Sequence, residues 1–378
     1  MEKHTMPSSW AAAFTVASVW FGTHVGGGFA TGNQVINYYV QFGWTGMIFP
    51  LLSMALLAYI FYLVTKFARI RGLTTYQDTF REIWNPHPKM ELTFEFFYIL
   101  VILAAVAAAI SGAASLLQKF TGMSYLSCCL VTIAVLVFLS IFGIKLIITV
   151  STFLSAAILV VVAIMVTSGL ATHLPELQAN MGGDLVRPGY AFFRGVIVYA
   201  GFQCVSIPCY LTASTTVSNN KGIKKAAILG ALMNGLALAA SACMLTAWYP
   251  EILAAGETTL PNLFVCESIG WSWLVTLYSV LLFCAFVSTS VTLVFSMIDR
   301  FSDKLPEKVP TIGRRIIVGA LVIALCFGVS LLGLSVIITK VYAMAGYISL
   351  LFIILPVLLF VPKKNKQYLA EHPDCQDD

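Results

Sequence analysis

Charged residues are scarce in this sequence. Asp, Glu, Lys and Arg make up 10% of its 378 residues, whereas a soluble domain carries about 25%. Hydrophobic residues make up 59%, and the mean hydropathy is +0.89. This composition excludes an ordinary soluble domain and indicates an integral membrane protein in a lipid bilayer. The net charge of +5 does not indicate nucleic-acid binding, because the basic residues cluster between apolar segments as a membrane topology signal does.

Catalytic and metal-binding patterns are also lacking. No Asp or Glu lies in the middle of an apolar segment, which disfavours a proton relay built from carboxylates. The segments between apolar runs are short and hold no cluster of His, Asp, Glu or Cys, so we expect no enzyme, no catalytic residue and no cofactor. Most of the nine cysteines lie within apolar segments without metal-ligand spacing, as small buried side chains do.

Long apolar runs dominate the chain. Windows of about 20 apolar residues predict ten membrane spans. They are Ser9–Val40, Gly43–Thr65, Glu91–Leu117, Met123–Ser140, Leu146–Gly169, Pro188–Leu211, Ala226–Trp248, Trp271–Met297, Ile316–Leu332 and Leu334–Val361. Of the 22 Lys and Arg residues, all but Lys119, Arg187, Arg194 and Lys340 fall on one side. The positive-inside rule then predicts a multi-pass protein of the cytoplasmic membrane with both termini in the cytoplasm.

Ten spans divide into two sets of five that start on opposite sides of the membrane, which is the topology of an inverted repeat. We therefore expect an all-α membrane protein with a 5+5 arrangement. Residues 9–169 form the first repeat and residues 188–361 the second. Residues 1–8 and 362–378 are a cytoplasmic N-terminus and a cytoplasmic tail.

The first span contains an unusual glycine run, Gly26-Gly27-Gly28, between Trp20 and a Tyr-Tyr pair. Each glycine costs a helix about 1 kcal/mol relative to alanine. A break here leaves backbone groups unpaired, and a membrane tolerates this only where protein buries the backbone or where it lines a cavity. The run therefore predicts a broken helix with a binding site in the gap.

The first span of the second set carries similar breakers, namely Gly195, Gly201 and Pro208. Interrupted segments at corresponding positions of two halves point to a transporter site. Glycine also serves helix packing in membranes, and this alternative stays open for each break.

The two breaks predict sites for opposite charges. Free N–H groups at Gly26, Gly27 and Gly28 would bind a carboxylate. Freed carbonyls near Tyr199, Gly201, Phe202 and Gln203 would accept from an amine, and the Tyr199 and Phe202 rings would cover an apolar part or face a quaternary ammonium. His24, beside the first break, is a candidate to carry a proton or bind the solute; a neutral histidine satisfied by a neighbouring helix is the alternative.

The stretch Gly26 to Gly32, which reads Gly-Gly-Gly-Phe-Ala-Thr-Gly, resembles the first-helix signature of the YkvI-type membrane protein family. That family is similar in turn to the amino acid–polyamine–organocation transporter superfamily with the LeuT fold. Gly201-Phe202 resembles the unwound centre of the sixth helix of such transporters. The sequence departs from the family pattern at Asn33-Gln34, near where relatives often carry an acidic residue.

The resemblance also implies a sodium site. Its ligands would be the carbonyl groups of Gly22, Val25 and Ala285 and the hydroxyl groups of Ser288 and Thr289. The alternative for these hydroxyls is a hydrogen bond within their own helix.

The breaks and the topology together predict a secondary active transporter, a sodium- or proton-coupled symporter of a small zwitterionic amino-acid-like solute. Transport of a quaternary ammonium or an organic anion, and a passive channel, are the alternatives. The sequence does not indicate the oligomeric state.

Overall fold

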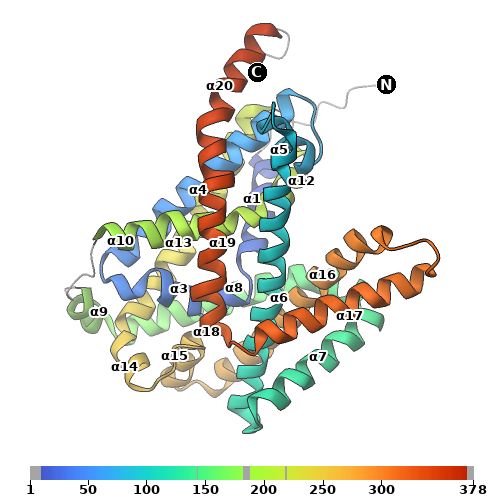
Figure 1. The fold of residues 1–378 in the computed structure, drawn as a ribbon. Coiled ribbons are helices and arrows are strands. Elements are labelled where there is room, and N and C mark those ends of the chain that lie inside the picture. The colour runs from blue at the N-terminus through green and yellow to red at the C-terminus, as the bar shows by residue number, and fades with distance from the viewer. Residues whose placement is uncertain (1–9, 143, 182–187, 218, 373–378) are drawn as a thin grey trace.

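The computed structural model describes residues 10–142, 144–181, 188–217 and 219–372, and within these ranges every regular element is a helix. Figure 1 shows long helices running between the two ends of the molecule, with the start of the first helix and the end of the last at the same end. The predicted all-helical class is confirmed.

The helices follow the order of the predicted spans. The first span is divided into α1 (Trp10–His24), α2 (Gly27–Ala30) and α3 (Asn33–Tyr38), followed by a 3-10 turn (Val40–Phe42). Seven spans consist of one main helix each: α4 (Thr45–Ile70), α6 (Glu91–Thr121), α7 (Tyr125–Phe142), α8 (Ile144–Thr172), α13 (Asn220–Ala247), α16 (Ser272–Phe301) and α17 (Thr311–Ser330).

The sixth and tenth spans change helix type along their length. The sixth comprises α10 (Pro188–Phe192), a π-helix (Phe193–Val198), α11 (Tyr199–Gln203), a 3-10 turn (Cys204–Ser206) and α12 (Ile207–Ser214). The tenth comprises α18 (Leu334–Val336), α19 (Tyr342–Ser349) and α20 (Leu355–Glu371), joined by π-helices at Ile337–Val341 and Leu350–Ile354. The connections hold α5 (Tyr76–Ile83), α9 (Leu174–Met181), α14 (Tyr249–Ala254) and α15 (Pro261–Ile269).

Seven helices of the described part are long and apolar enough to cross a membrane, or eight when Ala156–Thr172 and Leu174–Met181, bent by 80°, count as one span. The two remaining predicted spans are the shorter apolar helix Tyr125–Leu139 and the broken first span. The helices are therefore compatible with ten spans. The ninth and tenth meet at Gly333, whose φ of 84° reverses the chain within a short turn.

The sixth span differs in detail from its prediction. Its 26 residues Gly189–Ser214 stay helical throughout. Pro208 has no N–H to offer the carbonyl four residues earlier, and the preceding turn tightens into the 3-10 form. Gly201 lies inside α11, where a Cβ would lie 2.7 Å from the carbonyl oxygen of Gly346. Gly201 thus allows α11 and α19 to approach closely, and it is not the point at which the helix opens.

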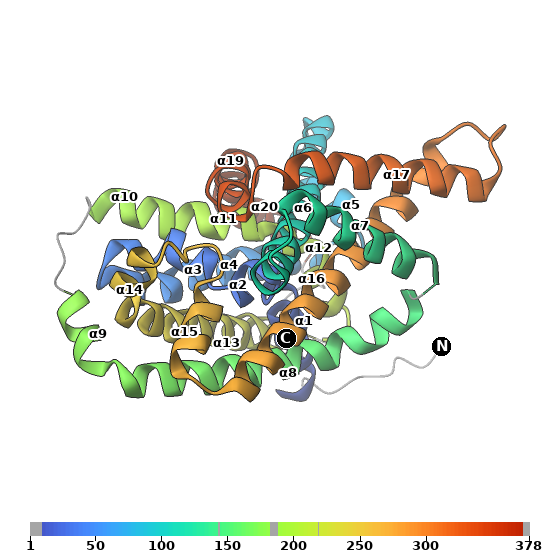
Figure 2. The ribbon, with the colours of Figure 1, turned by 90° about the horizontal axis from the view of Figure 1, so that it is seen from below.

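Corresponding members of the two sets of spans pack against each other. The second and seventh spans, α4 and α13, are in contact, as are the third and eighth, α6 and α16. Around the first pair lie α1 and α12, and around the second pair lie α7 and α17. Figure 2 shows α7 and α17 on one side of the molecule, away from α13. The division into residues 9–169 and 188–361 stays a prediction.

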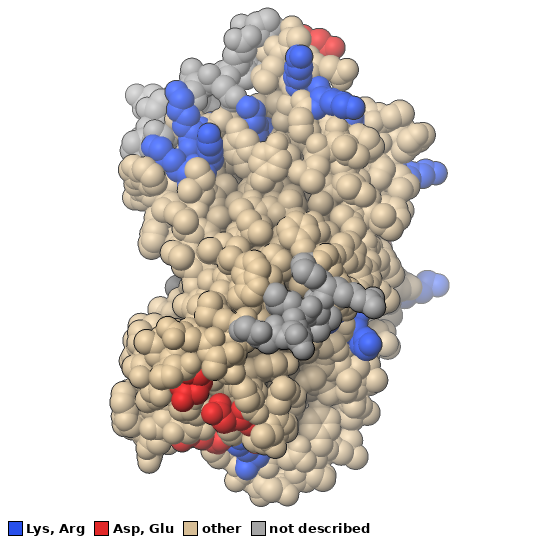
Figure 3. Space-filling model, turned by 90° about the vertical axis from the view of Figure 1, so that its left-hand side faces the viewer, with Lys and Arg blue, Asp and Glu red and all other residues tan. Residues whose placement is uncertain are grey.

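Basic side chains gather at the end of the molecule where α20 ends. Figure 3 shows Lys and Arg gathered at that end of one face beside an acidic group, and Asp and Glu together with further basic groups toward the other end. There α20 runs on to Glu371, past the predicted end of the span at Val361. Arg71 holds this extension, because its guanidinium donates to Asn365 Oδ1 at 2.7 Å and to the carbonyl of Lys364 at 3.0 Å.

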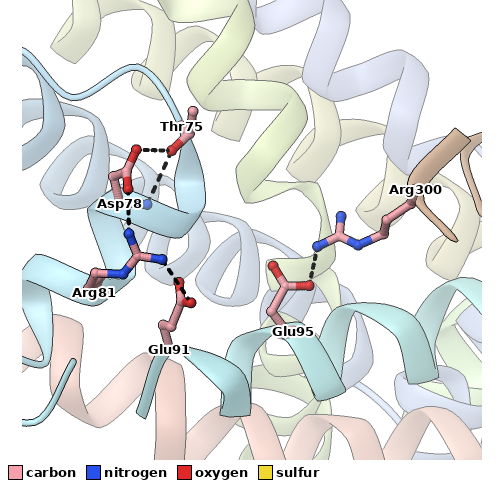
Figure 4. A network of polar contacts seen from close by, with 6 residues as sticks. All are labelled: Thr75, Asp78, Arg81, Glu91, Glu95 and Arg300. Atoms are coloured by element: carbon pink, nitrogen blue, oxygen red, sulfur yellow. Dashed lines mark hydrogen bonds and ion pairs between the residues drawn. The ribbon is translucent and has the colours of Figure 1, made fainter. Parts of the chain in front are cut away.

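A network of ion pairs fixes α5 and α16 to the start of α6, as Figure 4 shows. Arg81 of α5 pairs with Asp78 at 2.9 Å and with Glu91 of α6 at 3.1 Å. One turn further along α6, Glu95 pairs with Arg300 of α16. The charged side chains at this end therefore form ion pairs that hold α5, α6 and α16 together.

Candidate functional site

The first break in the first span begins where α1 ends at His24. Helix α2 begins at Gly27, so Val25 and Gly26 lie outside regular helix. The N–H of Gly26 donates to the carbonyl of His24 at 2.8 Å, and not to the carbonyl of Gly22 four residues back. The last carbonyls of a helix have no partner within it. The predicted break at the glycine run is thus present, and it leaves carbonyl groups free at the end of α1.

A second break follows α2 at Thr31 and Gly32. Gly32 has a φ of 80°, a conformation that glycine adopts without steric cost. Its N–H donates to the carbonyl of Phe29 at 2.9 Å, which closes a tight turn before α3. The first span is therefore interrupted twice within a few residues.

Open space borders the first break on one side only. A Cβ at Gly22 or Gly26 would meet no heavy atom within 4 Å, and the neighbouring Thr23 is exposed. At Gly28, by contrast, a Cβ would lie 2.2 Å from the side-chain nitrogen of Gln34. The break is therefore open beside α1 and covered beside α2.

The His24 ring is buried and held by two partners from other helices. Its Nδ1 lies 2.7 Å from Asn234 Oδ1, and its Nε2 lies 2.9 Å from the Tyr199 hydroxyl. The amide nitrogen of Asn234 donates to the carbonyl of Gly230 at 2.8 Å, so Asn234 Oδ1 faces His24 as an acceptor. His24 Nδ1 then carries a proton, and in the neutral ring Nε2 accepts from the Tyr199 hydroxyl. Both ring nitrogens are paired, as in the satisfied histidine that the sequence left as one alternative, and the ring joins α1, α11 and α13.

The aromatic side chains predicted to line the site pack against one another. The ring centroid of Tyr199 lies 5.3 Å from that of Tyr38, 5.0 Å from that of Tyr39 and 4.9 Å from that of Phe202. All four are buried, as is Gln203. They fix α11 against α3, and their rings are not arranged as a cage for a quaternary ammonium.

The residues of the predicted sodium site come from α1 and α16. Gly22 lies in the last turn of α1 and Val25 directly follows that helix, whereas Ala285, Ser288 and Thr289 lie in mid α16. The Ser288 hydroxyl donates to the carbonyl of Ala285 at 3.1 Å, which is the within-helix bond that the sequence offered as an alternative. A hydroxyl that donates its proton keeps its lone pairs, so this bond is compatible with a cation ligand.

A connecting segment closes the second break. This segment, Tyr249–Ile269, is called the lid here; it holds α14 and α15 at the end of the molecule opposite to α5 (Figure 1). The Asn262 side chain donates to the carbonyl of Ala30 at 2.9 Å, and its backbone N–H donates to that of Thr31 at 3.0 Å. Asn33 donates to the carbonyl of Thr258 at 2.8 Å. The breaks are therefore sealed on the lid side.

An ion-pair cluster adds to this seal. Lys119 at the end of α6 lies 2.9 Å from a carboxylate oxygen of Glu257 and 2.9 Å from one of Glu267, both on the lid. The lid is thus bound to α6 as well as to the first span.

Three buried amides near the breaks had no predicted role, namely Gln34, Asn234 and Asn262. Asn234 had a usable signal, since an amide in the middle of an apolar span seeks a polar partner. No cluster of three or more His, Cys, Asp or Glu suited to a metal ion occurs in the described ranges, and the cysteines described there are free.

Several solved structures share the fold of this chain. A structure of a Na+-coupled sialic acid symporter in its substrate-bound outward-open state superposes with a TM-score of 0.61 at 15% identity, covering 94% of this chain and 79% of that one. MhsT in complex with L-phenylalanine gives 0.60 at 15% identity, covering 94% and 98%. A manganese transporter of Eremococcus coleocola gives 0.53 at 14%, covering 95% and 80%. The chain has a LeuT-like fold.

The sequence of this chain aligns with that of one curated protein over nearly the whole length of both. The chain is 24% identical over 362 residues to the uncharacterized membrane protein YkvI of Bacillus subtilis (strain 168), covering 92% of this chain and 96% of YkvI. No family model matches the chain. The proteins of this comparison are named as transporters or as a membrane protein, and the names do not describe an enzyme.

Proposed function

We propose that this chain is a secondary active transporter, acting as a symporter of a small zwitterionic, amino-acid-like solute. The observation that carries the proposal is the break between His24 and Gly27 with open space beside Gly26. Irregular backbone within the membrane persists only where it is buried in protein or lines a cavity. A transporter needs such a cavity near the middle of the membrane.

The chemistry of the break favours a solute that carries both charges but no net charge. The free carbonyl groups at the end of α1 attract an ammonium group, and the first N–H groups of α2 at Gly27 and Gly28 attract a carboxylate. The partners of His24 are an amide and a hydroxyl, and the ion pairs found among the described residues lie elsewhere than the break. Because an unpaired charge is costly to bury, an ion with net charge is a poorer fit than a zwitterion.

The names of the solved relatives support a solute with a carboxylate. Sialic acid and L-phenylalanine, named with two of them, both carry one. The aromatic rings near Tyr199 contact one another, so they give no support to the quaternary ammonium alternative.

Two coupling ions fit the site. Sodium would take the carbonyl oxygens of Gly22, Val25 and Ala285 with the hydroxyls of Ser288 and Thr289; the sialic acid symporter, named as Na+-coupled, supports this choice. A proton would use His24. From the positive-inside rule we propose an orientation with both termini in the cytoplasm.

Uptake into proteoliposomes tests the proposal. The purified protein is reconstituted, and uptake of each labelled amino acid and of glycine betaine is followed under an inward sodium gradient, under a pH gradient and under neither. We expect accumulation of at least one zwitterion under one gradient. Failure of every solute under both gradients would refute a symporter of this class, and betaine uptake alone would move the assignment to quaternary amines.

A further inference from the structure

A charged side chain lies within the sixth span. Arg194 is the second residue of the π-helix Phe193–Val198, inside the apolar stretch Gly189–Ser214, and it is partly buried. A charge inside a membrane span is costly, and such residues commonly mark the path of a solute or an ion. Turns of π-helix are likewise frequent at functional sites. The position of Arg194 therefore calls for an anionic partner.

The guanidinium of Arg194 has weak partners for a charge in this place. Its Nε donates to the carbonyl of Asn37 at 3.3 Å, and one Nη donates to that of Thr339 at 3.4 Å. Both bonds are longer than the usual range of about 2.7–3.2 Å. The ion pairs found in the described ranges, such as that of Lys119 with Glu257, do not include Arg194. A guanidinium offers more N–H groups than these two bonds use, so Arg194 keeps the capacity to bind a carboxylate.

Two aromatic rings separate Arg194 from the first break. Its guanidinium carbon lies 4.9 Å from the centroid of the Tyr38 ring, which lies 5.3 Å from the centroid of the Tyr199 ring. The Tyr199 hydroxyl lies 2.9 Å from Nε2 of His24, the last residue of α1. Arg194 is therefore at the end of a line of contacts that leads to the proposed site.

A chain of hydrogen bonds joins Arg194 to the lid. The carbonyl of Asn37 accepts from Arg194, and the amide of Asn37 donates to the carbonyl of Asn33 at 2.9 Å. Asn33 in turn donates to the carbonyl of Thr258 on the lid at 2.8 Å. Arg194 therefore lies on the lid side of the break.

We propose that Arg194 captures the carboxylate of the incoming solute on the lid side of the site. This inference rests on the proposed function and adds to it the residue that selects a carboxylate. Arginine binds a carboxylate through two parallel N–H···O bonds, which are shorter and stronger than the bonds of Arg194 to the carbonyls of Asn37 and Thr339. The carboxylate replaces those two bonds and releases the sixth span from the first and the tenth. The solute then passes the rings of Tyr38 and Tyr199 to reach the break.

Three variants separate the charge of Arg194 from its place in the fold. Arg194→Gln removes the charge and keeps a hydrogen-bond donor for the neighbouring carbonyls. Arg194→Lys keeps the charge but binds a carboxylate as a point charge, without the paired bonds. Lys340→Gln is the matched control, since Lys340 is an exposed cation next to Thr339 on the tenth span.

The experiment uses the full chain in proteoliposomes, with an equimolar mixture of labelled L-amino acids as the probe. Unlabelled propionate, which carries the carboxylate alone, and propylamine, which carries the ammonium alone, serve as competitors. For Arg194→Gln we expect the apparent KM for the mixture to rise about 10- to 100-fold, the factor that a hydrogen bond to a charged group is worth, with the maximal rate near that of the wild type. Inhibition by propionate should weaken by the same factor, and inhibition by propylamine should not change. Arg194→Lys should lie between the wild type and Arg194→Gln, and Lys340→Gln should match the wild type.

The results separate the two proposals. If the wild type shows no uptake of the mixture, the proposed function itself fails for amino acids. If the wild type takes up the mixture and Arg194→Gln has the same KM and the same inhibition by propionate, only the capture by Arg194 is overturned. Equal weakening of inhibition by both competitors would show a structural role and overturn the capture as well. So would a loss of uptake in both Arg194→Gln and Arg194→Lys while each elutes as a folded, monodisperse protein, or wild-type uptake that propionate does not inhibit.

Discussion

The amide of Asn33 binds the first span to the lid, and removing it should open the lid. Its nitrogen lies 2.8 Å from the carbonyl of Thr258, 3.3 Å from that of Thr259 and 2.8 Å from the Ser335 hydroxyl. The bond to Ser335 lies outside the lid, so Asn33→Ala removes one good bond to the lid, the one to Thr258. This bond is worth about 0.5–1.5 kcal/mol net. The population with an open lid should rise about 2- to 13-fold.

Cys266 provides a natural reporter of this opening. It lies on α15 of the lid and is fully buried. Burial raises the pKa of the Cys266 thiol from 9.0 to about 12, so the reactive thiolate is scarce while the lid is closed. Labelling of Cys266 by a membrane-impermeant maleimide, read by mass spectrometry of its peptide, therefore measures the open population.

The pH dependence of this labelling has a definite sign. In the wild type, raising the pH from 7 to 9 leaves Cys266 far below its pKa of about 12, and the rate stays low because reaction requires opening. Once the lid opens, the thiol regains its ordinary pKa of 9.0, and the rate rises with pH up to that value. Asn33→Ala should thus label faster at every pH, by about 2- to 13-fold.

A matched control removes similar bonds elsewhere. Asn180 donates to the carbonyls of Thr246 at 3.0 Å and Ala247 at 3.2 Å, away from the first span. Asn180→Ala should leave the labelling of Cys266 unchanged. Equal labelling rates for Asn33→Ala and the wild type would show that these bonds do not hold the lid shut.

Two further changes test the packing. Gly346→Ala should lower the free energy of unfolding in detergent by about 1–3 kcal/mol, because the new Cβ would lie 2.5 Å from the carbonyl oxygen of Val198. Gly26→Ala should leave the free energy of unfolding near the wild-type value, because its Cβ meets open space. A larger loss for Gly26→Ala than for Gly346→Ala would show that Gly26 is the closely packed glycine and Gly346 is not. Arg71→Ala should speed hydrogen exchange in the last turns of α20, because Lys364 and Asn365 lose their partner; unchanged exchange there would show that other contacts hold the extension.

The spans and the first break were predictable because their causes are local. A span is a run of apolar residues, and the glycine run from Gly26 to Gly28 weakens a helix wherever it lies. The joint between the last two spans also follows from a local cause, the positive φ of Gly333. These features need no knowledge of what packs against them.

The form of the sixth span was not predictable, because glycine has two uses in a membrane helix. The sequence around Gly201 gives the same signal for a break and for a close helix contact. The choice depends on Gly346, which lies on a span far along the chain. The partners of His24 were also not predictable, because they are distant in sequence. Asn234 lies 210 residues away and Tyr199 lies 175 residues away.

These distant partners make a double-mutant cycle the direct test of the His24 contacts. Asn234→Ala removes the acceptor for Nδ1, and Tyr199→Phe removes the donor to Nε2. Either change leaves one nitrogen of a buried ring unpaired, and the ring is then free to turn toward the remaining partner. The loss in free energy of unfolding caused by Tyr199→Phe should therefore differ between the wild type and Asn234→Ala.

Coupling energies of hydrogen bonds in membrane proteins average about 0.6 kcal/mol and reach about 1.7 kcal/mol. We expect a coupling in this range between Asn234→Ala and Tyr199→Phe, measured by reversible denaturation in mixed micelles. Pairing Asn180→Ala with Tyr199→Phe should give additivity within about 0.5 kcal/mol, because Asn180 shares no recorded contact with Tyr199. Strict additivity of the first pair would mean that His24 does not bridge α11 and α13, and the neutral tautomer deduced from this geometry would lose its basis.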